Sequence, residues 1–180
     1  QEVEHFGMNG GHAARAEGKF YRIERTVEPD GHRVWTKDII TNLTDAPIGI
    51  MLSNHIDLGG HDGVSYSPVP NPSIFASVDG QGVGMIALDD VYLEHYETFF
   101  EDGIMGIRDH TFALDAGASY TLEWAVYVNR SGDYYDFIND ARRDLGVNRR
   151  IEGSFAFIDR REAPTREYVE RRGLAYVSVG

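Results

Sequence analysis

Apolar and polar side chains alternate with a two-residue period from residue 19 to about residue 130. In the first stretch, Tyr21, Ile23 and Val27 fall on one face of a strand, and charged or polar residues fall on the other. Pro29-Asp30-Gly31 follows, in which proline presets φ for a reverse turn and glycine accepts a positive φ. A second alternating stretch begins at once, so the pattern predicts a β-hairpin.

Six further stretches have strand character and are separated by turn signals about every 8–12 residues. They cover residues 48–56, 74–76, 83–88, 91–100, 104–114 and 120–128. Together with the hairpin they predict an all-β fold, an antiparallel β-sandwich of jelly-roll or supersandwich type. Residues 57–73 are rich in Gly, Pro, Ser and Asp and predict a long loop. Loops of this length are often functional.

The period changes after Asp133. Apolar residues now recur as one stripe of an amphipathic helix, which predicts a C-terminal helix over residues 134–145. The stripe consists of Tyr134, Phe137, Ile138, Ala141 and Leu145. Beyond it we expect a strand at 154–158, a short helix from 165 to about 173 and a buried strand at 174–180.

This pattern divides the chain into three parts. Residues 1–18 lack a period and predict an irregular N-terminal arm. Residues 19–130 form the β-sandwich domain, and residues 131–180 form a helix and C-terminal tail. The last strand either pairs with the main sheet or belongs to a junction with a further domain.

Composition and charge narrow the class of protein. The 180 residues are 42% hydrophobic and 12% aromatic, as in folded domains. With 29 acidic and 17 basic residues the net charge is -12, which excludes a nucleic-acid partner and disfavours an anionic membrane. The absence of cysteine excludes disulfides and thiolate metal sites. The chain opens at Gln1 without Met, as we expect of a mature secreted or periplasmic protein.

The densest polar cluster lies at the start of the long loop. His55 and Asp57 are two residues apart on a predicted strand, so their side chains leave the same face, and His61 follows after a short loop. His95, on another predicted strand, is a candidate fourth ligand. Imidazole and carboxylate ligands suit Zn, Cu or Fe. The set is therefore a candidate transition-metal site, with an ordinary loop and sheet surface as the alternative.

Paired carboxylates occur at Asp89-Asp90 and Glu101-Asp102. Two carboxyl groups across a cleft could cleave a glycosidic bond, and the same side chains with loop carbonyls could hold a structural Ca²⁺. In a chain this acidic, most such pairs lie in turns or on solvated faces. The cofactor therefore stays open between none, Ca²⁺ and a His-bound transition metal.

Several aromatic side chains are placed to meet a ligand. Sugars pack their C–H faces on aromatic rings and satisfy their hydroxyl groups with polar neighbours. The candidates are Trp35, Tyr66, Tyr92 and Tyr96, because each has charged or loop neighbours. Trp124 has apolar neighbours on its own face and is expected in the core.

Three segments together resemble a known class of domain. They are DGHRVWTKDIITNLTDAPIGI, ALDAGASYTLEWAVYV and DYYDFINDARRDLGVN. They resemble the hairpin, the closing strand and the exit helix of accessory β-sandwich domains in bacterial carbohydrate-active proteins of the glycoside-hydrolase type. The resemblance implies a module that binds poly- or oligosaccharide or braces an adjoining catalytic domain, without catalytic residues of its own.

Three hypotheses follow. The first is this carbohydrate-binding or accessory module, for which catalysis by the chain alone is not expected. The second is a metal-dependent enzyme with the His/Asp site on a sandwich scaffold. The third is a structural domain for oligomerisation.

Overall fold

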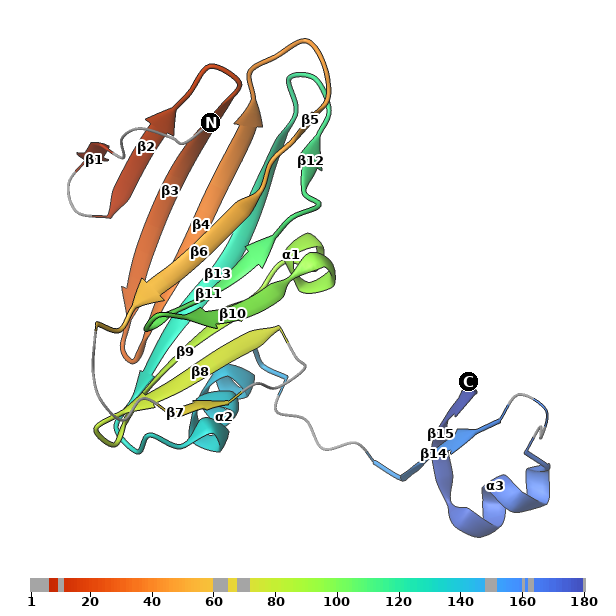
Figure 1. Cartoon of the computed structure of the whole chain (residues 1–180). Helices are drawn as coiled ribbons and strands as arrows, with labels where there is room; N and C mark the ends of the chain where they lie inside the picture. The colour runs from red at the N-terminus through yellow and green to blue at the C-terminus, as the bar shows by residue number, and fades with distance from the viewer. Residues whose placement is uncertain are drawn as a thin grey trace. The chain divides into compact units, whose positions relative to one another are not determined.

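The computed structural model of the chain describes residues 7–9, 12–59, 65–67, 72–147, 152–159, 161 and 164–179 (Figure 1). The described part is an all-β, antiparallel sandwich followed by a C-terminal helix and a small further unit, so the predicted fold class is confirmed. Contacts divide the chain into residues 1–141 and residues 142–180. No helix in the described part is long and apolar enough to cross a membrane.

An eight-stranded antiparallel sheet forms one layer of the sandwich. Its strands follow the order β1 (Gly7–Asn9), β2 (Ala13–Glu17), β3 (Tyr21–Asp30), β4 (Arg33–Asn42), β13 (Ser119–Asn129), β9 (Gln81–Ala87), β8 (Ser73–Val78) and β7 (Ser65–Ser67). The predicted hairpin is β3–β4, in which Asp30 lies opposite Arg33. The turn consists of Gly31 and His32, whereas Pro29 and Asp30 of the predicted turn lie within β3. This observed turn sets the register of the strand pair.

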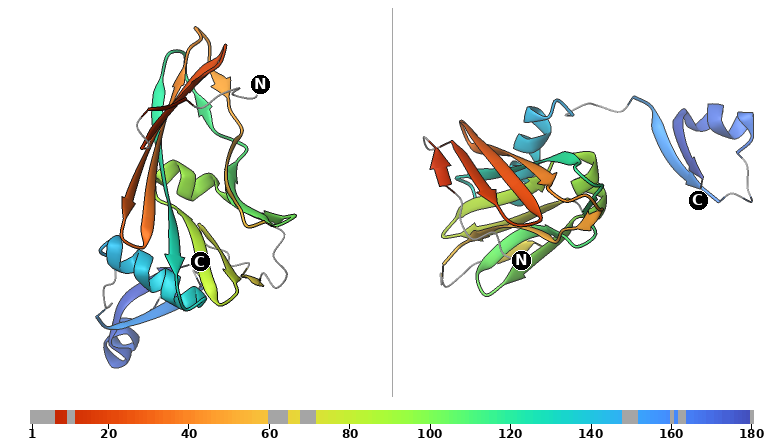
Figure 2. Two further views of the ribbon diagram at one scale, coloured as in Figure 1. Left: turned by 90° about the vertical axis from the view of Figure 1, so that its left-hand side faces the viewer. Right: turned by 90° about the horizontal axis from the view of Figure 1, so that it is seen from above.

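A smaller sheet forms the second layer. Its strands follow the order β10 (Glu97–Glu101), β11 (Ile104–Asp109) and β6 (Leu52–Asp57), and a short pair, β5 (Ile48–Gly49) and β12 (Ala113–Leu114), continues beside it. The left view of Figure 2 shows the two layers edge-on, with helix α1 (Asp90–His95) between them.

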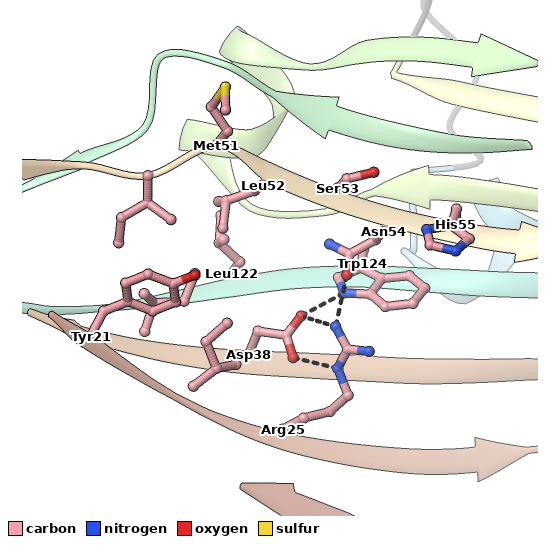
Figure 3. Close-up of a pocket in the computed structure, with 13 residues that line it drawn as sticks. Tyr21, Arg25, Asp38, Met51, Leu52, Ser53, Asn54, His55, Leu122 and Trp124 are labelled. Carbon is pink, nitrogen blue, oxygen red and sulfur yellow. Dashed lines mark hydrogen bonds and ion pairs between the residues drawn. The ribbon is translucent and has the colours of Figure 1, made fainter. Parts of the chain in front are cut away.

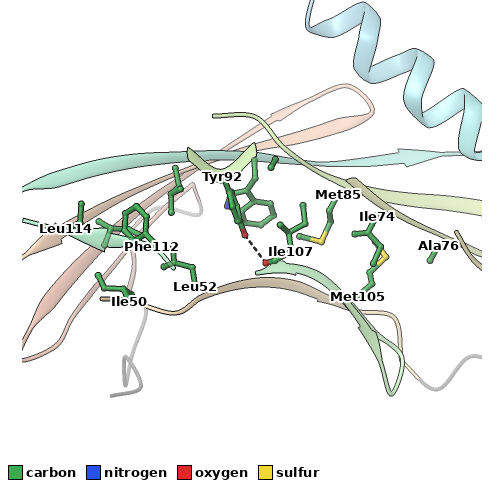
Figure 4. Close-up of a cluster of buried hydrophobic side chains, with 14 residues drawn as sticks. Ile50, Leu52, Ile74, Ala76, Met85, Tyr92, Met105, Ile107, Phe112 and Leu114 are labelled. Carbon is green, nitrogen blue, oxygen red and sulfur yellow. Dashed lines mark hydrogen bonds between the residues drawn. The ribbon is translucent and has the colours of Figure 1, made fainter. Parts of the chain in front are cut away.

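The core lies between the layers (Figure 4). Its members come from both sheets and from α1; they include Ile40, Leu52, Ile74, Met85, Tyr92, Met105, Ile107, Phe112, Leu122 and Trp124. Met85, Met105, Ile107 and Tyr92 have no exposed surface. The prediction that Trp124 belongs to the core is confirmed.

Helix α1 corrects the expectation of a continuous strand over 91–100. Asp89 stands before the helix in extended conformation and its carboxylate accepts a hydrogen bond from the Tyr92 amide at 3.0 Å. The second Asp89 oxygen accepts the Glu123 amide of β13 at 2.8 Å. A cap anchored to the neighbouring sheet thus starts a helix, and the strand begins only at Glu97.

The N-terminal arm also differs from its prediction. Residues 13–17 are not irregular but form β2, which pairs with β3. The residues of β2 opposite Ile23 and Arg25 are Ala16 and Ala14. Alanine gives little hydrophobic periodicity, so this strand has no visible pattern in the sequence.

The predicted C-terminal helix is confirmed as α2 (Tyr134–Asp144). Its buried residues, Phe137 and Ala141, pack with Phe75, Ala125 and Tyr127 of the large sheet. These sheet residues lie on the face opposite the main core, so α2 covers a second, smaller core.

Residues 142–180 contain a separate β-α-β unit. Strand β14 (Ser154–Ile158) and β15 (Leu174–Val179) are parallel, and α3 (Arg166–Arg172) connects them. The predicted strand and short helix are confirmed; Thr165 caps the start of α3 and Gly173 ends it in the left-handed conformation. The last strand pairs with β14 and is not buried as expected, since Tyr176 is 54% exposed.

Candidate functional site

A pocket of about 420 Å³ lies where β6 of the small sheet faces β3, β4 and β13 of the large sheet (Figure 3). Pockets of this size suit small molecules or part of a larger ligand. The lining residues are Tyr21, Ile23, Arg25, Asp38, Ile40, Ile50, Met51, Leu52, Ser53, Asn54, His55, Leu122 and Trp124.

An ion pair forms the floor of the pocket. Arg25 on β3 and Asp38 on β4 are directly opposite each other in the hairpin register. Arg25 Nε and Nη2 donate to Asp38 Oδ1 and Oδ2 at 2.6 and 2.8 Å. This two-bond geometry fixes both groups. The Asp38 side chain is 4% exposed and that of Arg25 is 28% exposed, so the arginine faces the pocket more than its partner does.

Trp124 completes this floor. Trp124 lies on β13 opposite Thr36 of β4, and Leu122, two residues earlier on β13, lies opposite Asp38. The indole therefore reaches the Asp38 carboxylate diagonally. Its Nε1 donates to Asp38 Oδ2 at 3.0 Å, and the Arg25 guanidinium lies over its ring at 5.3 Å. One carboxylate therefore positions both a cation and an indole.

The network crosses to the other sheet through Asn54 of β6. Arg25 Nη2 donates to Asn54 Oδ1 at 2.7 Å, and Asn54 Nδ2 donates to the Tyr92 hydroxyl at 3.1 Å. That hydroxyl donates to the Ile107 carbonyl at 2.9 Å (Figure 4). Burial raises the pKa of the Tyr92 hydroxyl far above its ordinary value, so it remains a donor. Buried polar groups in such a network are held rigidly because each has a partner.

The rim of the pocket is more open than its floor. Met51, just before β6, is 79% exposed, and Ser53 and His55 are exposed on β6. Tyr21 and Ile23, both half-buried on β3, form the opposite wall. The pocket thus combines an aromatic wall, a fixed polar floor and an accessible rim.

The predicted aromatic residues do not gather at this pocket. Trp35 is half-buried on the other face of β4, with the Arg33 guanidinium 5.0 Å from its ring. Tyr96 is half-buried against the core, and the side chain of Tyr66 lies outside the described part. Tyr92 is a correction: it is fully buried, because α1 turns its ring between the sheets, and it has no surface for a sugar.

The predicted metal ligands are only partly described. His61 lies outside the described residues. His55 and Asp57 share the outer face of β6, where Asp57 Oδ1 accepts the Gly59 amide at 2.8 Å. His95, at the end of α1, places Nδ1 3.5 Å from the buried Asp109 carboxylate. Within the described ranges, no group of three or more such ligands is placed to hold a metal, and the His61 site stays a prediction.

Three of the four residues in the predicted carboxylate pairs, Asp89, Glu101 and Asp102, have identifiable structural roles. Asp89 caps α1 and also binds the Glu123 amide. Glu101 Oε1 lies 3.4 Å from Arg108 Nη1. Asp102 occupies the turn between β10 and β11 with a positive φ of 51°.

Sequence reasoning missed Arg25 and Asp38, although both leave a signal. Arg25 falls on the apolar face of its strand, between Ile23 and Val27. Asp38 likewise falls on the apolar face of its strand, two residues before Ile40. Charged residues on a buried face are retained with partners. Counting outward from a turn centred on Asp30 would pair Arg25 with Trp35, and only the observed turn at Gly31-His32 pairs it with Asp38.

Comparison with known proteins gives the fold but no family. No family model matches the sequence, and no curated protein matches it either. A polysaccharide lyase structure superposes with a TM-score of 0.52 at 16% identity, covering 77% of this chain and 23% of that chain. A human-microbiome protein provisionally assigned as a kojibiose phosphorylase gives a TM-score of 0.48 at 13% identity over 77% of this chain and 21% of that one.

A third similar structure is provisionally assigned as an aldose 1-epimerase from Klebsiella pneumoniae. Its TM-score is 0.48 at 11% identity, over 81% of this chain and 54% of that one. All three are carbohydrate-active proteins by name. At 16% identity the similarity to the lyase shows the fold alone, and the chain spans about a quarter of the lyase.

Proposed function

We propose that this chain is an accessory β-sandwich module of a carbohydrate-active protein and that it binds a saccharide in the Arg25 pocket. The observation that carries this proposal is the pocket itself, in which an aromatic wall faces a polar floor whose groups are already positioned. The proposal keeps the secreted or periplasmic location and the adjoining catalytic domain expected from the sequence.

The chemistry of the pocket suits a sugar. The half-buried Tyr21 ring offers a surface for C–H groups, and a tyrosine has both an apolar face and a polar tip. Arg25 and Asn54 at the floor, and Ser53 and His55 at the rim, offer donors and acceptors for hydroxyl groups. Because the Asp38 network fixes the floor, little side-chain freedom is lost on binding.

The same pocket argues for binding rather than cleavage. Glycoside hydrolysis needs two carboxyl groups on either side of the bond. Asp38 is the only carboxylate among the thirteen described lining residues, and it is paired with Arg25 and Trp124. The similar fold of a polysaccharide lyase supports a carbohydrate-related role.

Calorimetric titration of the full chain with a panel of oligosaccharides tests the proposal. Tyr21→Ala should weaken the binding that is found at least about tenfold, about 1.4 kcal/mol. Tyr135→Ala, which removes a 72% exposed tyrosine of α2 outside the pocket, should leave it unchanged. Thermal unfolding of both variants checks that they are folded.

Two outcomes contradict the proposal. If the wild-type chain binds no saccharide, only the bracing role remains. If Tyr21→Ala and Tyr135→Ala weaken binding equally, the ligand does not occupy this pocket.

A further inference from the structure

The rim of the Arg25 pocket continues onto the outer face of the small sheet. β6 is the edge strand of that sheet, and its residues alternate. Leu52 and Asn54 are buried towards the large sheet, whereas Ser53 and His55 are exposed on the other side. Both exposed residues also line the pocket. A ligand that extends past the rim therefore meets the outer face next.

Strand register places a polar and aromatic platform beside this rim. Ser53 lies opposite Arg108 of β11, and Arg108 lies opposite Glu97 of β10. His55 lies opposite Gly106, which in turn lies opposite Phe99. Residues opposite each other share one face of a sheet. The platform thus follows the pocket without a break in the sheet.

Gly106 brings the Phe99 ring close to this face. A Cβ at position 106 would lie 2.6 Å from Phe99 Cζ, closer than atoms can approach. Because Gly106 has no side chain, the Phe99 ring can lie close to the backbone of β11 at this position. Phe99 is half-buried, so part of it remains accessible.

Arg108 orders the platform. Its guanidinium lies 5.1 Å from the Phe99 ring centre. Nε and Nη2 donate to the two Glu97 oxygens at 3.1 and 3.2 Å, and Nη1 donates to Glu101 at 3.4 Å. The result is an aromatic ring, a planar cation and two carboxylates, the same kinds of groups as in the pocket.

Charge selects among saccharides. The described charged side chains along this path are four carboxylates and two guanidinium groups, at Arg25, Asp38, Asp57, Glu97, Glu101 and Arg108. Residues 1–141 as a whole hold 23 acidic and eight basic residues, a net charge of -15. Such a field repels a polyanion, while neutral hydroxyl groups can bind both signs of charge.

We infer that the pocket and the Phe99–Arg108 platform together bind one neutral oligosaccharide chain, which crosses the edge of β6 at Ser53 and His55. This inference rests on the proposed function. It adds that the ligand is a chain of several sugars rather than a single sugar, and that it carries no uronic acid.

Length and charge series of oligosaccharides test the inference. Wild-type full chain is titrated with β-1,4-linked gluco-, manno- and xylo-oligosaccharides and with malto-oligosaccharides, each from monosaccharide to hexasaccharide. We expect affinity to rise with length. Phe99→Ala should remove the gain, about tenfold or more for the longest chains, and leave the monosaccharide unchanged. Phe157→Ala, at a ring that is 82% exposed in residues 142–180, is the control and should change nothing.

A second variant, Arg108→Gln, keeps the inference testable if Phe99→Ala does not fold. Arg108→Gln keeps the Phe99 ring and should also weaken only the longer ligands. Its control is Arg22→Gln, since Arg22 has the same exposure of 27% and is also paired with glutamates, but projects from the outer face of β3. Thermal unfolding confirms the fold of each variant.

The outcomes separate this inference from the proposed function. Equal affinity for monosaccharide and hexasaccharide overturns the platform and leaves the pocket. Oligogalacturonides that bind as tightly as neutral chains of equal length at low salt overturn the charge selection. No binding of any saccharide by the wild type overturns both proposals. Weaker binding of every ligand with Tyr21→Ala, and loss of the length gain alone with Phe99→Ala, supports both.

Discussion

The two units of the chain differ in charge and in burial. Residues 1–141 have a net charge of -15 and contain every buried hydrophobic residue of the described part. Residues 142–180 hold nine basic and six acidic residues, a net charge of +3, and none of their described residues is buried. The sandwich therefore has its own core, and the small unit lacks one.

The small unit shows what this lack means. Parallel sheets normally have both faces covered. Chains below about 40 residues seldom fold without disulfides, a bound metal or oligomerisation. In the β14–β15 pair, Phe155, Phe157 and Tyr176 are 51%, 82% and 54% exposed. Equal-sized aromatic residues should thus contribute very differently to stability in the two units.

The largest predicted effect concerns one aromatic residue from each unit. Phe137→Ala should lower the free energy of unfolding by about 3–5 kcal/mol, because Phe137 is fully buried against Phe75 and Tyr127. Phe157→Ala should change it by no more than about 0.5 kcal/mol, because its ring is mostly in water. Chemical denaturation of the full chain measures both. Equal losses would show that the small unit has a core of its own.

Ion pairs give the next comparison. Asp38→Ala should cost about 2–4 kcal/mol, because it leaves the Arg25 guanidinium and the Trp124 indole N–H without their shared acceptor. Glu170→Ala removes the partner of Arg166, a pair whose side chains are 62% and 91% exposed, and should cost about 0.3–0.5 kcal/mol.

A double variant separates burial from charge in this comparison. Arg25→Met with Asp38→Leu replaces the pair by apolar residues and should be more stable than Asp38→Ala alone. Urea unfolding compares the three chains. If Asp38→Ala costs less than about 1 kcal/mol, the pair is not a buried one in solution.

Much of the fold could be predicted because its signals are local. The turn signal at Pro29-Asp30-Gly31 predicted the β3–β4 hairpin, although the turn itself is Gly31-His32, and the stripe containing Phe137 and Ala141 predicted α2. Helix α1 escaped because its cap, Asp89, is anchored by the Glu123 amide from a distant strand. Such a bond leaves no local pattern.

The site was less predictable for a related reason. Neighbouring charges and aromatic residues along the chain drew attention to Trp35, Tyr92 and His95, which the structure does not bring together. The pocket instead depends on pairing across strands, as between Arg25 and Asp38, and on Asn54 reaching from the second sheet. The first contact needs the observed register, because a turn centred on Asp30 would pair Arg25 with Trp35, and the sheet-to-sheet contact needs the packed fold.

The smallest predicted effect is a pH dependence at the surface of the sandwich. Hydrogen bonds from Arg108 hold the pKa of Glu97 below its usual range. Since this pKa is lower in the folded than in the unfolded chain, the stabilisation is complete above the unfolded pKa, about 4.3, and is lost as pH falls through the folded pKa. Glu97→Gln should therefore lower Tm slightly near pH 6–7 and leave it unchanged at about pH 2–3.

The control Glu94→Gln makes the same charge change at an exposed residue with no ion pair in the described part. In so acidic a domain that change should leave Tm unchanged or raise it. If the two variants have the same pH profile of Tm, Arg108 does not stabilise the Glu97 carboxylate, and the order of the platform beside the pocket is lost with it.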